Sequence, residues 1–316
     1  MSCTTYTDFD AFSASIRDAD VSMMMVNPAE RLWRLNWVDV DGLNVQSGME
    51  GCGNISEGQA MPGGYLFFLP LSVTCEYRAN GKLINGNALA VLEPESTFCI
   101  RAERGHNWAS VFVPTERLAR TGAGPKSESG PPHADAPQCR VIACGGELAG
   151  MFGSAARQVI TAAACAPSFK ASPAAEATAD RLTRIASLIL SPDVGRCQTQ
   201  KGRRPYARQD IIERCHDLLM ARVNRPVRSS ELVAAAGVSE KTLQTIFKEY
   251  FGVGPHRYLQ LRQLFSVRRA LKSMDPAHSR VSDALVNHGV WEFGRFSGRY
   301  RQLFAESPSQ TLQRPS

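Results

Sequence analysis

The sequence predicts an α+β protein of two domains, with a strand-rich N-terminal domain and an all-helical C-terminal domain. Three observations support this fold class. Short apolar segments separated by Gly, Pro and Asn-Gly turns occupy the chain up to about Pro114. Beyond about Gly145, apolar residues recur at the three- and four-residue spacing of amphipathic helices. The last third of the chain contains one helix-turn-helix pattern twice.

The strand predictions rest on apolar patterning between turn signals. Asn80-Gly81 is a strong hairpin signal, and Asn85-Gly86 marks a second turn. The predicted strands are Arg31–Val38, Gly63–Leu71, Val73–Tyr77, Ala88–Leu92 and Trp108–Val113. Many short strands joined by turns are typical of a small barrel or a double sheet.

The rest of the N-terminal domain is predicted as a loop and two helices. Residues 122–137 lack an apolar period, so we expect a loop there. Helices are expected within residues 145–190, and their apolar stripes can pack on the sheet or on a second copy of the chain. The stripes comprise Leu148, Met151, Phe152, Ala155 and Val159, then Ala175, Ala179, Leu182, Ile185, Ala186 and Ile189. The predicted domains are residues 1–190 and 206–316, with 191–205 as the linker.

Charge is distributed unevenly along the 316 residues. The net charge is +6, but residues 201–316 contain 20 Lys/Arg and 10 Asp/Glu, against 16 and 20 before them. A basic helical half suits phosphate binding. Nine cysteines without a Cys-x-x-Cys pair suit a reducing cytosol. There is no signal-peptide pattern and no apolar run of membrane-spanning length, so we expect a cytoplasmic protein without a membrane partner.

The first helix-turn-helix unit spans Ser229–Leu243, with Gly237 in the tight turn. Ser229 or Ser230 is expected to cap its first helix, and Ser239 its second. The second helix has an inward face of large apolar residues four apart, namely Leu243, Phe247 and Phe251. Its outward side chains suit base edges and phosphates, and they are Lys241, Thr242, Gln244, Thr245 and Lys248.

The second unit spans Val281–Phe296, with Gly289 in the turn. Its inward residues are again four apart, and they are Phe296, Tyr300 and Phe304; its basic outward candidates are Arg295, Arg299 and Arg301. A connecting helix is predicted at His256–Leu271, which would fix the separation of the two units. On it, Arg262, Arg268 and Arg269 are expected mostly to face solvent or phosphate.

A specific set of residues links both units to a known family. They are Gly237-Val238-Ser239, Leu243, Phe247 and Phe251-Gly252-x-x-Pro255, then Gly289, Phe293-Gly294-Arg295-Phe296, Tyr300-Arg301, Phe304 and Pro308-Ser309. With them, about Gln209 to Arg314 resembles the DNA-binding domain of AraC/XylS-type bacterial transcription regulators. The resemblance implies that Lys241, Gln244, Thr245 and Lys248, then Arg295 and Arg299, reach successive major-groove segments of promoter DNA.

The resemblance also implies a cupin-like barrel as the N-terminal sensor, which binds a small-molecule effector and forms a homodimer. Activation through RNA polymerase is the usual outcome in this family, and repression is equally compatible with these residues. Inward aromatic residues would line the effector pocket, although ordinary core packing is the alternative for each. The candidates are Trp33, Trp37, Phe67, Tyr77 and Trp108, with Arg31, Arg34, Glu76 or Arg101 as polar anchors.

The chain departs from the family pattern at several positions. Val233 and Leu285 occupy positions that are usually small, and Ala305 replaces the Gly that usually follows the last Phe. Gly294 and Gly298 stand where long base-reading side chains are common, and each glycine costs a helix about 1 kcal/mol relative to Ala. We therefore expect the second unit to read little sequence directly or to become ordered only on DNA.

Catalytic patterns are absent from the sequence. Residues 1–200 contain only His106 and His133, so a metal site of several His is not expected, and neither is a cofactor. Cys52 lies between two glycines but has no positioned His, and no nucleophile elbow or phosphate loop occurs. The predicted function is a sequence-specific DNA-binding regulator. The alternatives are a nucleic-acid-binding enzyme with a helix-turn-helix anchor and a non-specific DNA-binding protein.

Overall fold

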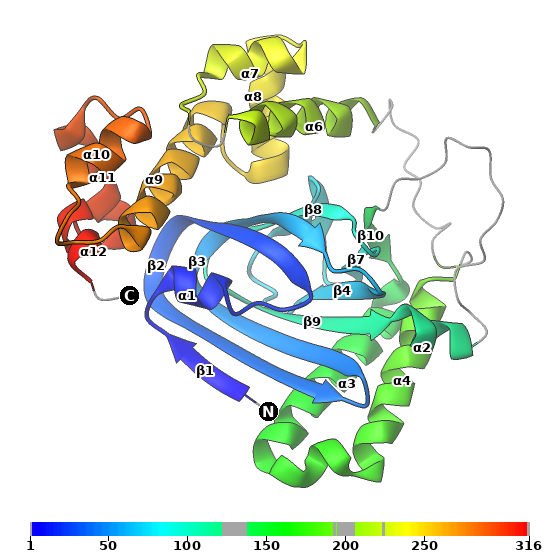
Figure 1. Cartoon of the computed structure of the whole chain (residues 1–316). Helices are drawn as coiled ribbons and strands as arrows, with labels where there is room; N and C mark the ends of the chain where they lie inside the picture. The colour runs from blue at the N-terminus through cyan, green and yellow to red at the C-terminus, as the bar shows by residue number, and fades with distance from the viewer. Residues whose placement is uncertain (1, 122–137, 192–193, 195–205, 223–224, 315–316) are drawn as a thin grey trace. The chain divides into compact units, whose positions relative to one another are not determined.

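The computed structural model describes residues 2–121, 138–191, 194, 206–222 and 225–314. The chain divides, in the main, into two compact units, one up to Lys201 and one from Gly202 to Ser316 (Figure 1). This division falls within the predicted linker 191–205, of which 192–193 and 195–205 lie outside the described residues, as do the predicted loop 122–137 and His133. The predicted domain limits remain a prediction.

The N-terminal unit is a nearly closed antiparallel β-barrel of ten strands (Figure 1). The strands are β1 (Ser2–Tyr6), β2 (Ala19–Val40), β3 (Leu43–Ala60), β4 (Gly64–Pro70), β5 (Tyr77–Ala79), β6 (Lys82–Ile84), β7 (Ala88–Leu92), β8 (Thr97–Ala102), β9 (His106–Pro114) and β10 (Cys139–Ala143). Their order is β10-β7-β4-β9-β3-β8-β5-β6, with β2 paired to β3 and β1 to β2. The predicted strand-rich barrel is therefore confirmed.

Two hairpins turn on residues with positive φ. Asn80 (φ 48°) and Gly81 (φ 76°) join β5 to β6, where Ala79 pairs with Lys82. This is the two-residue turn that an Asn-Gly pair predicts. Asp41 (φ 45°) and Gly42 (φ 78°) join β2 to β3 in the same way.

The long β2–β3 hairpin exceeds the sequence prediction, which covers only Arg31–Val38. β2 has 22 residues and β3 has 18, and β3 is rich in Gly and polar residues, which are depleted in strands. Its glycines are explained by close approaches: a Cβ on Gly48 would lie 2.3 Å from Trp108, and one on Gly51 would lie 2.4 Å from the Glu30 carbonyl oxygen. Tertiary packing therefore overrides local propensity here. The short helices α1 (Phe9–Ser13) and α2 (Thr115–Arg120) were also not expected.

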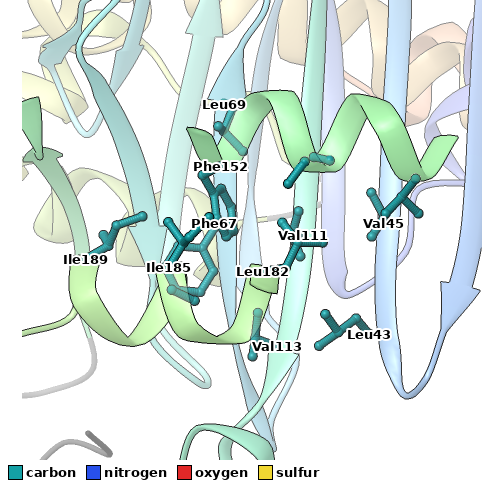
Figure 2. Close-up of a cluster of buried hydrophobic side chains, with 14 of the residues drawn as sticks. Leu43, Val45, Phe67, Leu69, Val111, Val113, Phe152, Leu182, Ile185 and Ile189 are labelled. Carbon is teal, nitrogen blue, oxygen red and sulfur yellow. The ribbon is translucent and has the colours of Figure 1, made fainter. Parts of the chain in front are cut away.

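Both faces of the central strands are buried, which explains the continuous apolar run at Gly63–Leu71. On one face, Phe67 and its neighbours pack under α3 (Gly145–Cys165) and α4 (Pro173–Ile189), with η1 (Pro167–Ala171) between these helices (Figure 2). The Phe67 and Phe152 rings are 5.2 Å apart. The alternate residues, such as Leu66, line the barrel interior. The predicted stripe of α4 therefore packs within the chain, and so does that of α3 except for the exposed Met151.

The C-terminal unit is entirely helical across the residues described. Its helices are α6 (Tyr206–Ala221), α7 (Ser229–Ala236), α8 (Glu240–Phe251), α9 (Pro255–Ser273), α10 (Val281–Asn287), α11 (Phe293–Phe304) and α12 (Pro308–Gln313). The α7–α8 and α10–α11 pairs are the two predicted helix-turn-helix units, and α9 is the predicted connecting helix. This part of the predicted fold is confirmed.

Candidate nucleic-acid interface and barrel pocket

The first unit places α8 by a tight turn and two caps. Gly237 has a φ of 66° and ends α7, as predicted. The N-cap of α7 is Arg228, whose backbone N–H donates to the Glu231 carboxylate at 2.8 Å. The expectation that Ser229 or Ser230 caps this helix is therefore wrong, because the N-cap position is one residue earlier and its backbone N–H is satisfied by the Glu231 side chain. Ser239 caps α8 as predicted, since its Oγ accepts from the Thr242 N–H at 3.2 Å.

Helix α8 separates an apolar inner face from a polar outer face. Its inner residues are buried, and the Phe247 ring lies 5.0 Å from that of Phe251 and 5.5 Å from that of Tyr258 on α9. The five outer residues are all exposed, and they are Lys241, Thr242, Gln244, Thr245 and Lys248. All of these except Thr242 recur at helical spacing on one side, so they form a continuous polar stripe.

The side chain of Gln244 lies against Gly254 at the start of α9. A Cβ on Gly254 would lie 2.5 Å from Gln244 Nε2, so the amide packs directly on the backbone at the start of α9. The glycine leaves space for the side chain of the recognition helix. Thr245 donates its hydroxyl to the Lys241 carbonyl at 3.1 Å. The stripe thus combines two exposed lysines with two side chains whose positions are restrained.

The second unit repeats the inner face but not the outer one. Gly289 has a φ of 67°, and the predicted inward aromatic residues of α11 are buried. A Cβ on Gly294 or Gly298 would meet no atom within 4 Å, so the outer face of α11 is bare at both positions. Arg295 is exposed and pairs with Glu292 at 2.8 Å. Arg301 is exposed, and Arg299 is half-buried.

A buried polar network fastens α11 to α9. Arg268 and Glu306 form an ion pair and are each about 4% exposed. Glu306 also accepts from the Thr311 hydroxyl at 2.8 Å, and that hydroxyl lies 2.8 Å from the hydroxyl of Tyr300. Burial raises the pKa of Tyr300. Arg268 is therefore an exception to the expectation that most of the arginines of α9 face solvent or phosphate, because it neutralises a buried carboxylate.

A basic recess lies beside α9 in the C-terminal unit. It has a volume of about 370 Å³, and neither Asp nor Glu occurs among its lining residues. Its basic residues are Arg222, Arg225, Arg228, Arg262, Arg299, His256 and His288. Burial and the nearby Arg299 guanidinium lower the pKa of Arg257. Cations crowded in this way favour an anionic partner such as a phosphate. Sequence reasoning missed this recess, although the Arg-rich stretch 222–228 is a signal for it.

Two aromatic side chains at the start of α11 are also exposed. Trp291 is 78% exposed and Phe293 is 39% exposed. Neither residue was predicted from the sequence as a DNA contact.

The barrel interior contains a pocket with a buried polar end. Glu50 on β3 lies directly opposite His106 on β9, and Gly48 lies opposite Trp108. Because Gly48 has no side chain, the Trp108 ring lies across it, and its Nε1 donates to Glu50 Oε1 at 2.8 Å. Asn54 Nδ2 donates to the other oxygen of Glu50. Burial raises the pKa of Glu50 above its usual value, and the nearby His106 and these hydrogen bonds offset that rise only in part.

The predicted effector-binding residues separate into two groups. Trp108 lines this pocket, and Tyr77 lies beside it, with its ring 5.3 Å from that of His106. The other three lie elsewhere. Trp33 packs on Phe9, Arg17 stacks on Trp37 and Phe67 belongs to the core under α3. Of the proposed polar anchors, Arg101 pairs with Glu76 at 3.0 Å.

Among the described residues, no three His, Cys, Asp or Glu side chains cluster as metal ligands would. Within that same part of the chain, no helix combines the length and the apolar content needed to cross a bilayer.

Comparison with known proteins points to the C-terminal unit. A family model described as "Helix-turn-helix domain" matches residues 232–314. The "Probable thc operon regulatory protein" of Rhodococcus erythropolis is 32% identical over 103 residues, which are 33% of this chain and 31% of that protein. The "XylDLEGF operon transcriptional activator 2" of Pseudomonas putida is 30% identical over 101 residues, which are 32% of this chain and 64% of that protein. The chain therefore spans less than two thirds of the length of these relatives.

Solved structures are similar over different extents. The AraC-like transcriptional activator CuxR aligns with 84% of this chain and 94% of its own, at 12% identity and a TM-score of 0.43. A probable AraC family transcriptional regulator from Rhodopseudomonas palustris CGA009 aligns with 34% of this chain and 99% of its own, at 28% identity and a TM-score of 0.30.

Proposed function

We propose, from the premise that the C-terminal unit is a helix-turn-helix domain of the AraC/XylS type, that this chain is a sequence-specific DNA-binding transcription regulator. The observation that carries the proposal is the exposed polar stripe of α8, presented by a buried aromatic face and an N-cap. Gln pairs with adenine, Lys meets guanine or phosphate, and Thr contacts the thymine methyl group. The regulators that this region is similar to are named for their operons.

The proposed DNA contacts come from both units. The first unit would read bases, and the basic recess would receive backbone phosphates. Contacts are assigned to Lys241, Thr242, Gln244, Thr245, Lys248, Arg295, Arg299 and Arg301. The outer face of α11 has two glycines that cannot read a base, and its Arg295 pairs with Glu292. This supports a mainly positional role for the second unit, in which its arginines bind phosphate.

The N-terminal barrel would act as the sensor. In this proposal it binds a small-molecule effector and forms the homodimer, and the effector changes how the DNA-binding unit is presented. Activation through contact with RNA polymerase is the favoured outcome, since the Pseudomonas relatives are named activators. The chain would act by binding rather than catalysis, and it would work in the cytoplasm, where promoter DNA is located.

The decisive experiment is a DNA titration of the whole protein. Binding to DNA upstream of its own and neighbouring genes is compared with binding to random DNA over a range of salt concentrations. A preference of at least roughly a thousandfold identifies a specific regulator. Equal affinity for both DNAs with a steep salt slope would instead identify a non-specific DNA-binding protein.

A further inference from the structure

The barrel pocket has apolar walls and one polar end. Its walls include Leu66, Phe68, Leu92, Phe98 and Ile100, and the polar end comprises Glu50, Asn54 and His106. All three polar residues are at least nine-tenths buried. Such a pocket, apolar with a few convergent polar groups, has the usual composition of a small-molecule site.

The chemistry of the polar end is set by Glu50. The N–H of Trp108 and one N–H of Asn54 are already donated to its carboxylate. A carboxylate has about four lone-pair positions, so Glu50 can still accept from a further donor. Glu50 therefore offers acceptor positions to a ligand, while the Trp108 N–H and one N–H of Asn54 are already occupied.

His106 adds to this acceptor character. Its Nδ1 lies 2.9 Å from the Arg104 carbonyl oxygen and 3.2 Å from that of Cys52. Carbonyl oxygens only accept, so Nδ1 carries the hydrogen. The other nitrogen, Nε2, faces Glu50 Oε1 at 3.6 Å, which is longer than a hydrogen bond. A ligand donor on the pocket side of both atoms, at hydrogen-bond distance from each, could bind both.

The polar end of the pocket has no Lys or Arg to pair with an anionic ligand. No lysine is among the lining residues, and the lining arginine, Arg17, is exposed, with its guanidinium 3.4 Å from the centre of the Trp37 ring. A ligand carboxylate at the polar end would face the Glu50 carboxylate in a low-dielectric interior, where like charges repel strongly. The pocket should therefore reject small anions.

We infer that this pocket binds a small amine, whose ammonium group donates to Glu50 and whose short apolar body lies against Phe68 and Phe98. The assignment of this amine as the effector rests on the proposed regulatory function. Binding of the amine to the barrel does not depend on it. The free space of about 60 Å³ is below the ~150 Å³ of an apolar cavity that binds benzene, which favours a short aliphatic body.

The test compares three probes of equal carbon number on the full-length protein. n-Butylamine, 1-butanol and butyrate are titrated to millimolar concentration at constant ionic strength and pH 7, by calorimetry and by ligand-observed NMR. We expect n-butylamine to bind at least ten times more tightly than either other probe. Binding of butyrate or butanol as tight as that of the amine, or no binding of the amine, would overturn the proposal.

Two variants locate the interaction. Glu50→Gln keeps the size of the side chain and should reduce affinity for n-butylamine at least tenfold. Glu57→Gln, on the same strand but outside the pocket lining, should leave it unchanged. Unfolding curves of both variants verify that they are folded. Unchanged affinity in folded Glu50→Gln would also overturn the proposal, and the wild-type probe series decides the matter if this variant does not fold.

Failure of this inference differs from failure of the proposed function. The same protein preparation is titrated with its upstream DNA and with random DNA. Specific DNA binding without amine binding contradicts only the ligand assignment. Amine binding without specific DNA binding contradicts only the regulatory function.

Discussion

The two helix-turn-helix units have the same inner face but different helix ends. In the first unit, the Ser239 side chain caps α8 and Gly252 ends it with a φ of 75°. In the second, Glu292 makes no capping hydrogen bond to α11, and Ala305 ends the helix in the left-handed region at a φ of 52°. Both units therefore form with the same inner aromatic spacing, although the caps of their second helices differ.

The outer faces differ even more. The five outward positions of α8 all carry exposed polar side chains, whereas the outer face of α11 has a bare glycine at Gly294 and another at Gly298. An aromatic inner face positions a recognition helix, but sequence is read only by what projects outward. We expect the first unit to carry most of the base discrimination and the second to position the protein on the DNA.

The largest effect is expected at Arg268 in the second unit. Arg268→Ala should destabilise the C-terminal unit by about 3 kcal/mol, because Glu306 would remain buried without its main partner. The loss of stability is measured by urea unfolding of the variant and by hydrogen exchange of the backbone amides of α11 and α12. Arg280, before α10, is exposed and its side chain makes no capping hydrogen bond, so Arg280→Ala should change stability by less than about 0.5 kcal/mol. Equal effects of the two variants would contradict a special role for the buried pair.

The next largest effect, on DNA binding, distinguishes the outer face of α8 from that of α11. Lys241→Ala should weaken binding to the preferred DNA about tenfold and reduce discrimination at one half of the site. Arg295→Ala should weaken binding to all sequences alike and lower the salt slope by about 1. Lys82→Ala, an exposed charge on the barrel, is the control. Loss of discrimination in Arg295→Ala but not in Lys241→Ala would reverse the roles of the two units.

A smaller effect is expected at the helix ends. Gly252→Ala should destabilise the first unit by about 1 kcal/mol, since a Cβ is disfavoured in the left-handed conformation. Ala305→Gly should stabilise the second unit by about 0.5 kcal/mol, because the gain is partly offset by unfolded-state entropy. Thermal unfolding of both variants provides the measurement. Stabilisation by Gly252→Ala would show that backbone strain is not what distinguishes these ends.

The smallest effect on binding is expected at Gly298. Gly298→Ala has open space for its Cβ and should stabilise α11 by somewhat less than about 1 kcal/mol. Base discrimination should be unchanged, because neither Gly nor Ala can read a base edge by hydrogen bonding. DNA titration and thermal unfolding test the two statements. A large loss of affinity would mean instead that the DNA backbone approaches this glycine closely.

The parts that sequence predicts well are those with local causes. The positions of Gly237, Ser239 and the α8 stripe follow from helical period, turn and cap within about twenty residues. The cap of α7 is less certain from sequence, because Ser229, Ser230 and Glu231 can all act there and only geometry selects among them.

The parts that sequence misses depend on distant residues. Glu50 and His106 meet because β3 pairs with β9, and Gly48 is required by Trp108 from that same strand. Tyr77 and Trp108 reach the pocket region, but Phe67 points to the opposite face of β4. Side chains alternate between the two faces of a strand, so a shift of one residue in register would exchange these faces. Arg268 likewise finds Glu306 only in the folded state.

Gly289 has a further consequence for DNA recognition. A Cβ there would lie 2.3 Å from Pro226, which precedes the first unit, and Gln263 of α9 donates to the His288 carbonyl at 2.9 Å. The first contact joins the second turn to the segment before the first unit and the second joins it to α9, so both restrain the distance between the recognition helices. One base pair added between the two binding segments would rotate one of them by about a tenth of a helical turn. Binding should therefore tolerate changes in the bases of the operator better than changes in the spacing between its two binding segments.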